Sequence, residues 1–251
     1  VGGDVTISDL SAVVTGLLLA FNLPAGLPVW MSLVGAFIAI VIIKQLFGGL
    51  GYNFANPAIV GRIAMALGFT GAMTSYTYPE NGIDALASAT PLAVEETAQN
   101  AGSYVTLLLG NHGGVLGETC AIALIIGGVY LIVTKVISPT IPVTYLATVA
   151  VLSLIAGKDP IYQLLSGGLL LGAFFMATDY VTSPTTTKGK LVFGIGLGII
   201  TCAIRFLGTM NEGVSFAILL MNLMVPYIEV LTRQDRLGIA KVKKSKEGAA
   251  K

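Results

Sequence analysis

Charged side chains are scarce in this sequence. Lysine, arginine, aspartate and glutamate together make up 11% of its 251 residues, whereas soluble domains carry about 25%. Hydrophobic residues make up 55%, and the mean hydropathy is +0.85. The net charge of +1 provides no basic surface for nucleic acid. Because charge is costly inside lipid, this composition predicts an integral membrane protein in a lipid bilayer.

Residue types that bind metals or form disulfides are also rare. The chain has one histidine and two cysteines, Cys120 and Cys202, which lie far apart within apolar runs. Such cysteines are typical of buried free thiols rather than of zinc ligands or a disulfide. No cysteine cluster could hold an iron–sulfur centre, and no Gly-x-Gly-x-x-Gly lies between a strand and a helix. The sequence therefore predicts no metal site, and we do not expect this chain alone to be a complete redox enzyme.

Apolar runs alternate with polar breaks along the chain. A membrane-spanning helix needs about 20 residues. We expect about eight membrane segments, at residues 11–22, 29–47, 57–69, 118–137, 143–155, 162–176, 191–206 and 214–231. We predict that the first and the sixth are half-helices that end at polar residues, and that 143–155 crosses together with its flanks.

The two short segments also suggest an internal repeat. The run GLLLAFNLP at 16–24 is similar to GLLLGAFFMATD at 168–179, and a glycine-containing break follows the next crossing in each case, at 48–53 and 208–213. Paired broken helices are typical of inverted repeats with a binding site near the membrane midplane. Such breaks persist in lipid only when they are buried in protein or line a cavity. Chance similarity of glycine–leucine runs is the alternative.

Lysine and arginine predict how the chain is oriented in the membrane. Neither occurs between Arg62 and Lys135, an interval that contains the polar loop 70–117, whereas the tail is basic. We therefore place the tail in the cytoplasm, facing anionic lipid or a soluble partner, and the loop outside the cytoplasmic membrane. The chain divides into a first membrane part, 1–69, the extracytoplasmic loop, 70–117, a second membrane part, 118–232, and the cytoplasmic tail, 233–251.

The polar loop contains the run IDALASATPL at 83–92. Small residues surround Thr90, and the proline that follows favours an extended backbone at this threonine. A threonine hydroxyl with so little bulk around it could accept a covalent group. Turn or capping chemistry is the alternative for a Ser-x-Thr-Pro sequence.

Several motifs together resemble the RnfD/NqrB family, most closely its RnfD branch. The run from Asp84 to Thr90 is similar to the family's flavinylation motif, usually Asp-x-x-Ser-Gly-Ala-Thr, with Ala87 in place of serine and Ser88 in place of glycine. The other matching stretches are GGLGYNFANP at 48–57, GAFFMATDYVTSP at 172–184 and GVSFAILLMNLMVP at 213–226. The resemblance implies an all-α polytopic membrane fold of ten helices with an inverted repeat, similar to urea transporters, so two helices are expected before Val1.

The resemblance also implies a cofactor. Thr90 is expected to carry FMN through a phosphodiester bond that a flavin transferase forms outside the membrane. Asp84, Ser88 and Ala89 complete this cofactor-binding motif, and Asp84 either helps the transferase to bind metal or caps a turn. The loop contains no lysine or arginine, so we expect backbone N–H groups to meet the phosphate. Riboflavin, present without a covalent link in the NqrB branch, is a second candidate cofactor.

Polar residues near or within the apolar segments are further candidates. Three asparagines, Asn53, Asn56 and Asn222, either hydrogen-bond a flavin ring or bridge helices. A second group, Asp179 with Thr178 and Thr182, either forms a path for Na⁺ or H⁺ or caps a turn after a short helix.

Two arginines lie in or beside apolar segments. We expect Arg205 to extend along the helix to the outer membrane interface, and the alternatives are pairing with Glu212 or with the FMN phosphate. We expect Arg62 to anchor the cytoplasmic side.

The function that the resemblance implies is membrane electron transfer. The chain is expected to be a subunit of an Rnf-type, ion-translocating ferredoxin:NAD⁺ oxidoreductase complex, and to pass electrons among other Rnf subunits that hold flavins and iron–sulfur clusters. Two rival interpretations are a transporter or channel without redox work, and a scaffold that holds the other subunits. Replacing Thr90 separates electron transfer from both rivals.

Overall fold

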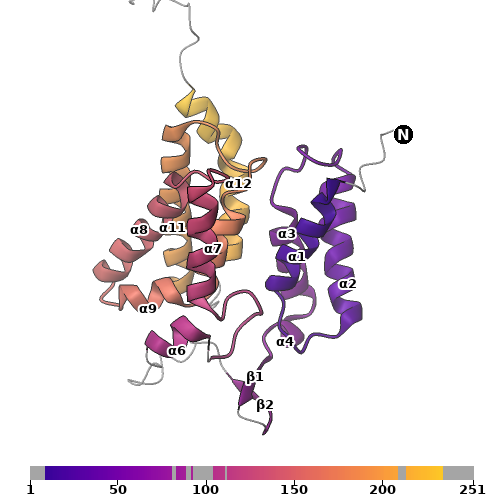
Figure 1. The fold of residues 1–251 in the computed structure, drawn as a ribbon. Coiled ribbons are helices and arrows are strands. Elements are labelled where there is room, and N and C mark those ends of the chain that lie inside the picture. The colour runs from indigo at the N-terminus through magenta and orange to yellow at the C-terminus, as the bar shows by residue number, and fades with distance from the viewer. Residues whose placement is uncertain are drawn as a thin grey trace, which may run out of the picture.

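The computed structural model describes residues 9–80, 83–88, 92, 104–110, 112–208 and 213–233, and these form two helical blocks (Figure 1). The first block contains α1 (Ser11–Phe21), α2 (Val29–Phe37), its π-helical continuation η2 (Ile38–Gln45), α3 (Pro57–Gly68) and α4 (Thr70–Met73). The second contains α6 (Tyr104–Leu109), α7 (Ala121–Val133), α8 (Thr140–Ile155), α9 (Pro160–Leu165), α10 (Leu169–Leu171), η3 (Gly172–Met176), α11 (Thr187–Leu207) and α12 (Gly213–Thr232).

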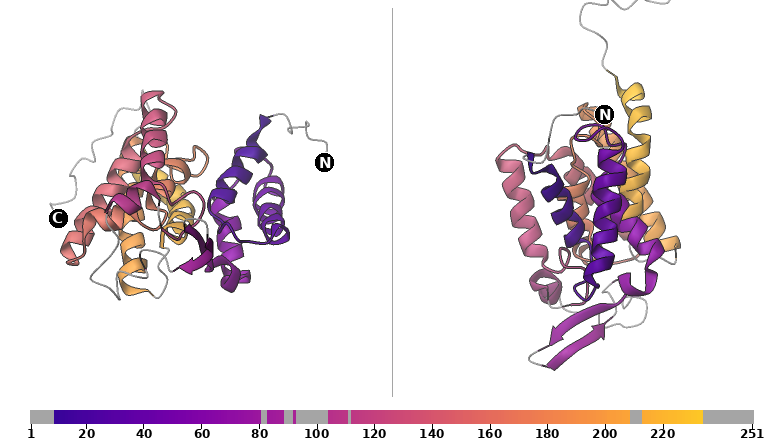
Figure 2. Two further views of the ribbon diagram at one scale, coloured as in Figure 1. Left: turned by 60° about the horizontal axis from the view of Figure 1, so that its bottom comes forward. Right: turned by 90° about the vertical axis from the view of Figure 1, so that its right-hand side faces the viewer.

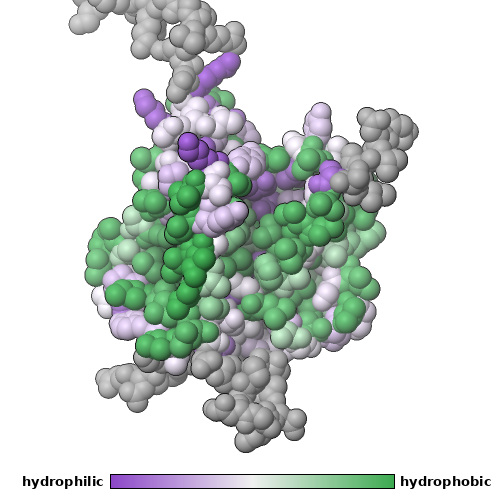
Figure 3. Space-filling model, viewed as in Figure 1, coloured by the Kyte–Doolittle hydropathy of each residue, from purple (hydrophilic) through white to green (hydrophobic). Residues whose placement is uncertain are grey.

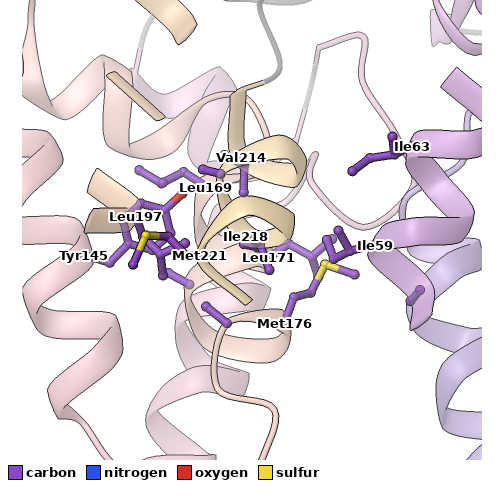
Figure 4. Packing of buried hydrophobic residues seen from close by; sticks show 14 of the residues in the cluster. Ile59, Ile63, Tyr145, Leu169, Leu171, Met176, Leu197, Val214, Ile218 and Met221 are labelled. Carbon is purple, nitrogen blue, oxygen red and sulfur yellow. The ribbon is translucent and has the colours of Figure 1, made fainter. Parts of the chain in front are cut away.

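One apolar core joins the two blocks. It contains Leu19 and Ile59 from the first block and Tyr145, Leu197 and Ile218 from the second, all almost fully buried. Figure 4 shows Ile59 of α3 facing the short helical turn that carries Met176. The short segment η3 therefore lies between the blocks and not at the outer surface.

Apolar side chains also cover the outside of the helices (Figure 3). Exposed examples include Leu33, Phe37, Val133 and Leu154. By length and composition α11 and α12 could each cross a membrane, and α1, α2 with η2, α3, α7 and α8 are shorter apolar helices. An outer surface of this kind fits the membrane protein that the composition predicts. The expected total of eight segments, the inverted repeat and the urea-transporter-like fold remain predictions.

A pair of strands corrects the expectation of a purely helical chain. Strands β1 (Tyr76–Glu80) and β2 (Ile83–Ser88) pair in antiparallel fashion and form a hairpin. Asn81-Gly82 stands between them in the sequence, and this dipeptide strongly favours two-residue hairpin turns. The hairpin lies at one end of the bundle, and the C-terminal end of α12 lies at the other (Figure 2).

The expected segment 162–176 is also not one helix. It contains α9, then a break, then α10 continuing into η3. Gly167 and Gly168 form the break with φ of +69° and +65°, a left-handed conformation that glycine adopts without steric cost. The half-helix that was predicted there therefore begins at Leu169, and it is preceded by a separate helix.

Both half-helices begin and end in a similar way. The residue before α1, Leu10, has φ of 56°, close to the value at Gly168 before α10. Their far ends meet, because Asn22 Nδ2 after α1 lies 3.5 Å from Met176 Sδ at the end of η3. These features place the two polar breaks next to each other inside the protein, as broken helices in a membrane require.

Small residues allow α8 and α11 to approach closely. A Cβ built on Gly194 of α11 would collide with Thr144 Oγ1 of α8, and one built on Gly198 would lie 2.5 Å from Thr148 Cβ. Two glycines one helical turn apart against two threonines are a packing pattern common between membrane helices.

We expect Gly194→Val to destabilise the protein by about 1–3 kcal/mol, because the added methyl groups force these two helices apart. The measurement is the melting midpoint of the detergent-solubilised protein, followed by the loss of its monodisperse chromatographic peak. Gly16→Val is the matched control, since a Cβ on Gly16 meets no atom within 4 Å. Equal midpoints for the two variants would contradict this account of the interface.

Candidate functional site

The motif in the polar loop lies partly on the hairpin. Asp84 and Ser88 belong to β2, and Ser88 is paired in register with Tyr76 of β1. Tyr76 is itself buried. The candidate residues Ala89 and Thr90 lie outside the residues that the structure describes. The strand that leads into the motif is therefore fixed to the protein by β1.

Leu92, two positions after the motif, is packed against the second helical block. Leu92 is 7% exposed. A Cβ on Gly167 would collide with Leu92 Cδ1, so the leucine side chain lies directly over the Gly167 backbone. Gly167 belongs to the break between α9 and α10. The sequence alone did not link the loop to this break, because the two are more than seventy positions apart.

Arg205 of α11 holds the same break together. Its Nη1 donates to Gln163 O at 2.8 Å and to Gln163 Oε1 at 3.1 Å, and its Nη2 donates to Ser166 O and Gly167 O, both at 3.0 Å. The side chain is 7% exposed. The prediction that Arg205 extends to the membrane interface is therefore wrong. The carbonyl groups left free where α9 ends attract the guanidinium into the protein.

Arg62 is also buried and does not anchor a membrane interface. It lies on α3 with 4% of its surface exposed. Its Nη1 donates to Asn22 Oδ1 at 3.1 Å and to Ser215 Oγ of α12 at 2.8 Å. The arginine thereby joins the end of the half-helix α1 to the second block. A charge inside a membrane protein persists where polar partners of this kind surround it.

Two of the candidate asparagines bridge helices. Asn56 caps α3 by accepting from Ala58 N at 3.0 Å, and its Nδ2 donates to Met176 O at 3.2 Å. With the amide of Asn222 turned to satisfy its neighbours, its Oδ1 accepts from Asn56 N at 3.0 Å and its Nδ2 donates to Thr182 O at 3.1 Å. These contacts confirm the bridging role. Contact of either asparagine with a flavin remains a prediction.

Asn53 has a local role in the described structure. Its Nδ2 donates to Ala55 O at 3.0 Å, and the side chain is 7% exposed. This bond shapes the polar break that precedes α3. It lies at the same N-terminal end of α3 as the Asn56 cap, three positions earlier in the chain.

Asp179 caps the turn after η3. Its Oδ2 accepts from Thr182 Oγ1 at 2.9 Å and its Oδ1 from Val181 N at 3.4 Å. Burial raises the pKa of the Asp179 carboxyl, and this outweighs the lowering by the Thr182 and Val181 bonds and by the charge of Lys44. Thr178 instead donates back to Phe174 O at 2.7 Å. Asp179 is therefore hydrogen-bonded to Thr182, whereas the Thr178 hydroxyl bonds to the preceding helical turn and not to Asp179.

Residues that sequence reasoning missed include Asn22, Gln163 and Leu92. Their side chains are buried polar or apolar partners of the two arginines and of the α9–α10 break. The sequence signal related to them is arginine within apolar runs, which in membrane proteins indicates that a partner lies inside the protein but does not identify that partner. Cys120 and Cys202 are both free thiols; Cys202 is buried, as predicted, whereas Cys120 is partly exposed.

Comparison with known proteins identifies relatives over nearly the whole chain. Residues 2–238 match the family described as NQR2, RnfD, RnfE. One relative is the subunit designated D of the Na⁺-translocating ferredoxin:NAD⁺ oxidoreductase complex of Acetobacterium woodii. It is 48% identical over 244 residues, which cover 96% of this chain and 76% of that protein. The equivalent subunit of the proton-translocating complex of Clostridium ljungdahlii is 42% identical over 252 residues, covering 93% and 76% respectively.

A more distant relative agrees. The D-designated subunit of the ion-translocating oxidoreductase complex of Alcanivorax borkumensis is 37% identical over 261 residues, which cover 92% of this chain and 76% of that protein. The family match and the relatives both extend across the two helical blocks and the hairpin between them. The chain belongs to the NQR2, RnfD, RnfE family.

Proposed function

We propose that this chain is the membrane electron-transfer subunit of an ion-translocating ferredoxin:NAD⁺ oxidoreductase complex, with FMN covalently attached to Thr90. The observation that carries the proposal is 48% identity, over 96% of the chain, to a subunit of such a complex. The other subunits of that complex are its proposed partners, since this sequence has no motif for NADH or for iron–sulfur clusters.

The hydroxyl of Thr90 is the group that the phosphodiester linkage needs, and FMN held there would supply one- and two-electron chemistry. Asp84 and Ser88, on a paired strand, would present the motif to a flavin transferase together with Ala89. Riboflavin is a second candidate cofactor. Asn53, Asn56 and Asn222 are the polar groups at the helix breaks that could meet a flavin ring.

The proposed topology places the hairpin outside the cell membrane and the C-terminal tail in the cytoplasm of a multi-pass protein. The hairpin and the end of α12 lie at opposite ends of the bundle, which supports this orientation. The first two relatives named above differ in the ion they move. Either Na⁺ or H⁺ is therefore proposed, with Asp179 and Thr182 as the polar pair on its path and Thr178 beside them.

Intact mass spectrometry tests the cofactor. We expect the subunit from flavinylating cells to exceed its sequence mass by FMN less one water and to fluoresce in gels under ultraviolet light. Thr90→Ala should remove both signals, and Thr90→Ser should restore them in part because it keeps a hydroxyl. Thr97→Ala, which removes another threonine hydroxyl of the same loop outside the motif, is the control and should keep the added mass. A wild-type subunit with no added mass, or a Thr90→Ala variant that keeps it, would refute the attachment.

A further inference from the structure

We infer that Leu92, Gly167 and Arg205 form an anchor that fixes the position of the flavin-bearing motif relative to the membrane helices. We call these three residues the Leu92 anchor. The inference rests on the proposed function for its meaning in electron transfer. Its structural part rests on contacts among described residues alone.

The first part of the anchor is the packing of Leu92 against Gly167. The side chain lies over the Gly167 backbone where any Cβ would collide with it, and Gly167 has φ of +69°. Both the space and the backbone conformation therefore require glycine at this position. The leucine is 7% exposed although it lies within the polar loop 70–117. A buried apolar residue within such a loop holds the chain to the rest of the protein.

The second part of the anchor is the guanidinium of Arg205. Its two Nη groups make four hydrogen bonds, two of them to Gln163 of α9 and two to backbone carbonyls of the break. Gln163 and Ser166 are each 1% exposed. Charge-assisted bonds in a buried setting are strong. The break is thereby held in one conformation, and so is the Gly167 backbone against which Leu92 packs.

The Leu92 anchor is close to Thr90 in the sequence. Thr90 is two positions before Leu92. On the other side, Ser88 is held in the hairpin opposite Tyr76. In the sequence, the threonine proposed to carry FMN thus falls between two residues, Ser88 and Leu92, that are both fixed to the protein. Leu92 is a positioning residue for the cofactor, because it would act through the backbone and not by touching the flavin ring.

The test uses the complete complex with Leu92→Ala, Leu92→Met or no substitution. Leu109→Ala is the matched control, since Leu109 is 59% exposed on α6 in the same polar loop region. Three quantities are measured: intact mass of the subunit, hydrogen exchange of the backbone from 83 to 92, and ferredoxin:NAD⁺ turnover. We expect Leu92→Ala to keep the added mass, to speed hydrogen exchange about tenfold or more, and to lower turnover about tenfold or more through a misplaced cofactor.

Two control variants separate the loss of the Leu92 contact from a general effect of substitution. Leu92→Met keeps the volume and should stay near wild type in exchange and in turnover, and Leu109→Ala should match wild type in all three measurements. Unchanged exchange in Leu92→Ala would overturn the anchor, whatever the mass. Faster exchange with added mass and normal turnover would overturn its role in positioning the cofactor. A wild-type protein without added mass would instead refute the proposed function, and hydrogen exchange would still decide the structural part.

Discussion

Arg205→Ala is expected to lower the stability of the protein by roughly 3–5 kcal/mol, because it removes the buried charged group on which four hydrogen bonds depend. The substitution would leave four buried oxygen acceptors without the guanidinium that now meets them. Each buried acceptor left unsatisfied costs about 1–3 kcal/mol, and the apolar surroundings offer little compensation. For a domain of this size the melting midpoint should fall by roughly 6–20 °C.

The measurement is the same detergent melting assay as for Gly194. Arg205→Lys should give an intermediate loss of stability. The guanidinium reaches its acceptors with two separate nitrogen atoms, and a single ammonium group cannot reach all of them. Arg233→Ala is the control, since Arg233 is exposed just after α12. If Arg205→Ala melted like Arg233→Ala, the guanidinium would contribute no net stability, and the conformation of the α9–α10 break would have to arise from its glycines alone.

The positions of the long helices could be predicted from the sequence because lipid selects continuous apolar runs. Helices α11 and α12 match the expected segments to within a few residues. The expected segment 57–69 begins where α3 begins, at Pro57, a residue that suits the first turn of a helix, and the Asn56 cap supports this start. Local chemistry of this kind acts through neighbours in the chain, so it can be recognised from the sequence.

The network around the breaks could not be predicted, because its partners are distant in the chain. Arg62 meets Asn22 and Ser215, which are 40 and 153 positions away. Arg205 bonds mainly to backbone carbonyls, and these become available only because α9 ends at the glycine pair. Hydropathy identifies both arginines as unusual in apolar runs, but it carries no information about which loop they hold.

The hairpin is a different case, because its signal is local. Asn81-Gly82 favours a two-residue turn, but the flanking strands are short and lie within a long polar interval. Hydropathy detects membrane-length apolar runs and gives such strands no weight. Turn chemistry, applied to the same interval, would have predicted them.

Buried polar groups connect the two half-helices to each other. Asn22 ends α1, and it contacts both Arg62 and Met176. Asn56 and Asn222 then link the end of η3 to α3 and α12. Both helix breaks are thereby satisfied by the opposite block, and neither could exist in lipid alone. A substitution at one break is therefore expected to affect the other.

Thr90→Ala is expected to abolish ferredoxin:NAD⁺ turnover of the complete complex while leaving the complex assembled. The reason is that a missing covalent flavin would interrupt the electron path, whereas the substitution removes only a small polar group from the loop. Turnover is measured with purified complex, and assembly by the subunit composition of the chromatographic peak. Thr90→Ser and Thr97→Ala are the matched variants, and only Thr97→Ala should keep full turnover.

The combination of mass and turnover decides among the three functions. Electron transfer through this chain predicts that added mass and turnover disappear together in Thr90→Ala. A transporter, a channel or a scaffold predicts that turnover survives, because neither ion movement through the helices nor the holding of other subunits needs the threonine hydroxyl. Loss of the added mass with full turnover would place the flavin outside the electron path. Loss of turnover in a protein that never carried the added mass would show that Thr90 acts through its contacts and not through FMN.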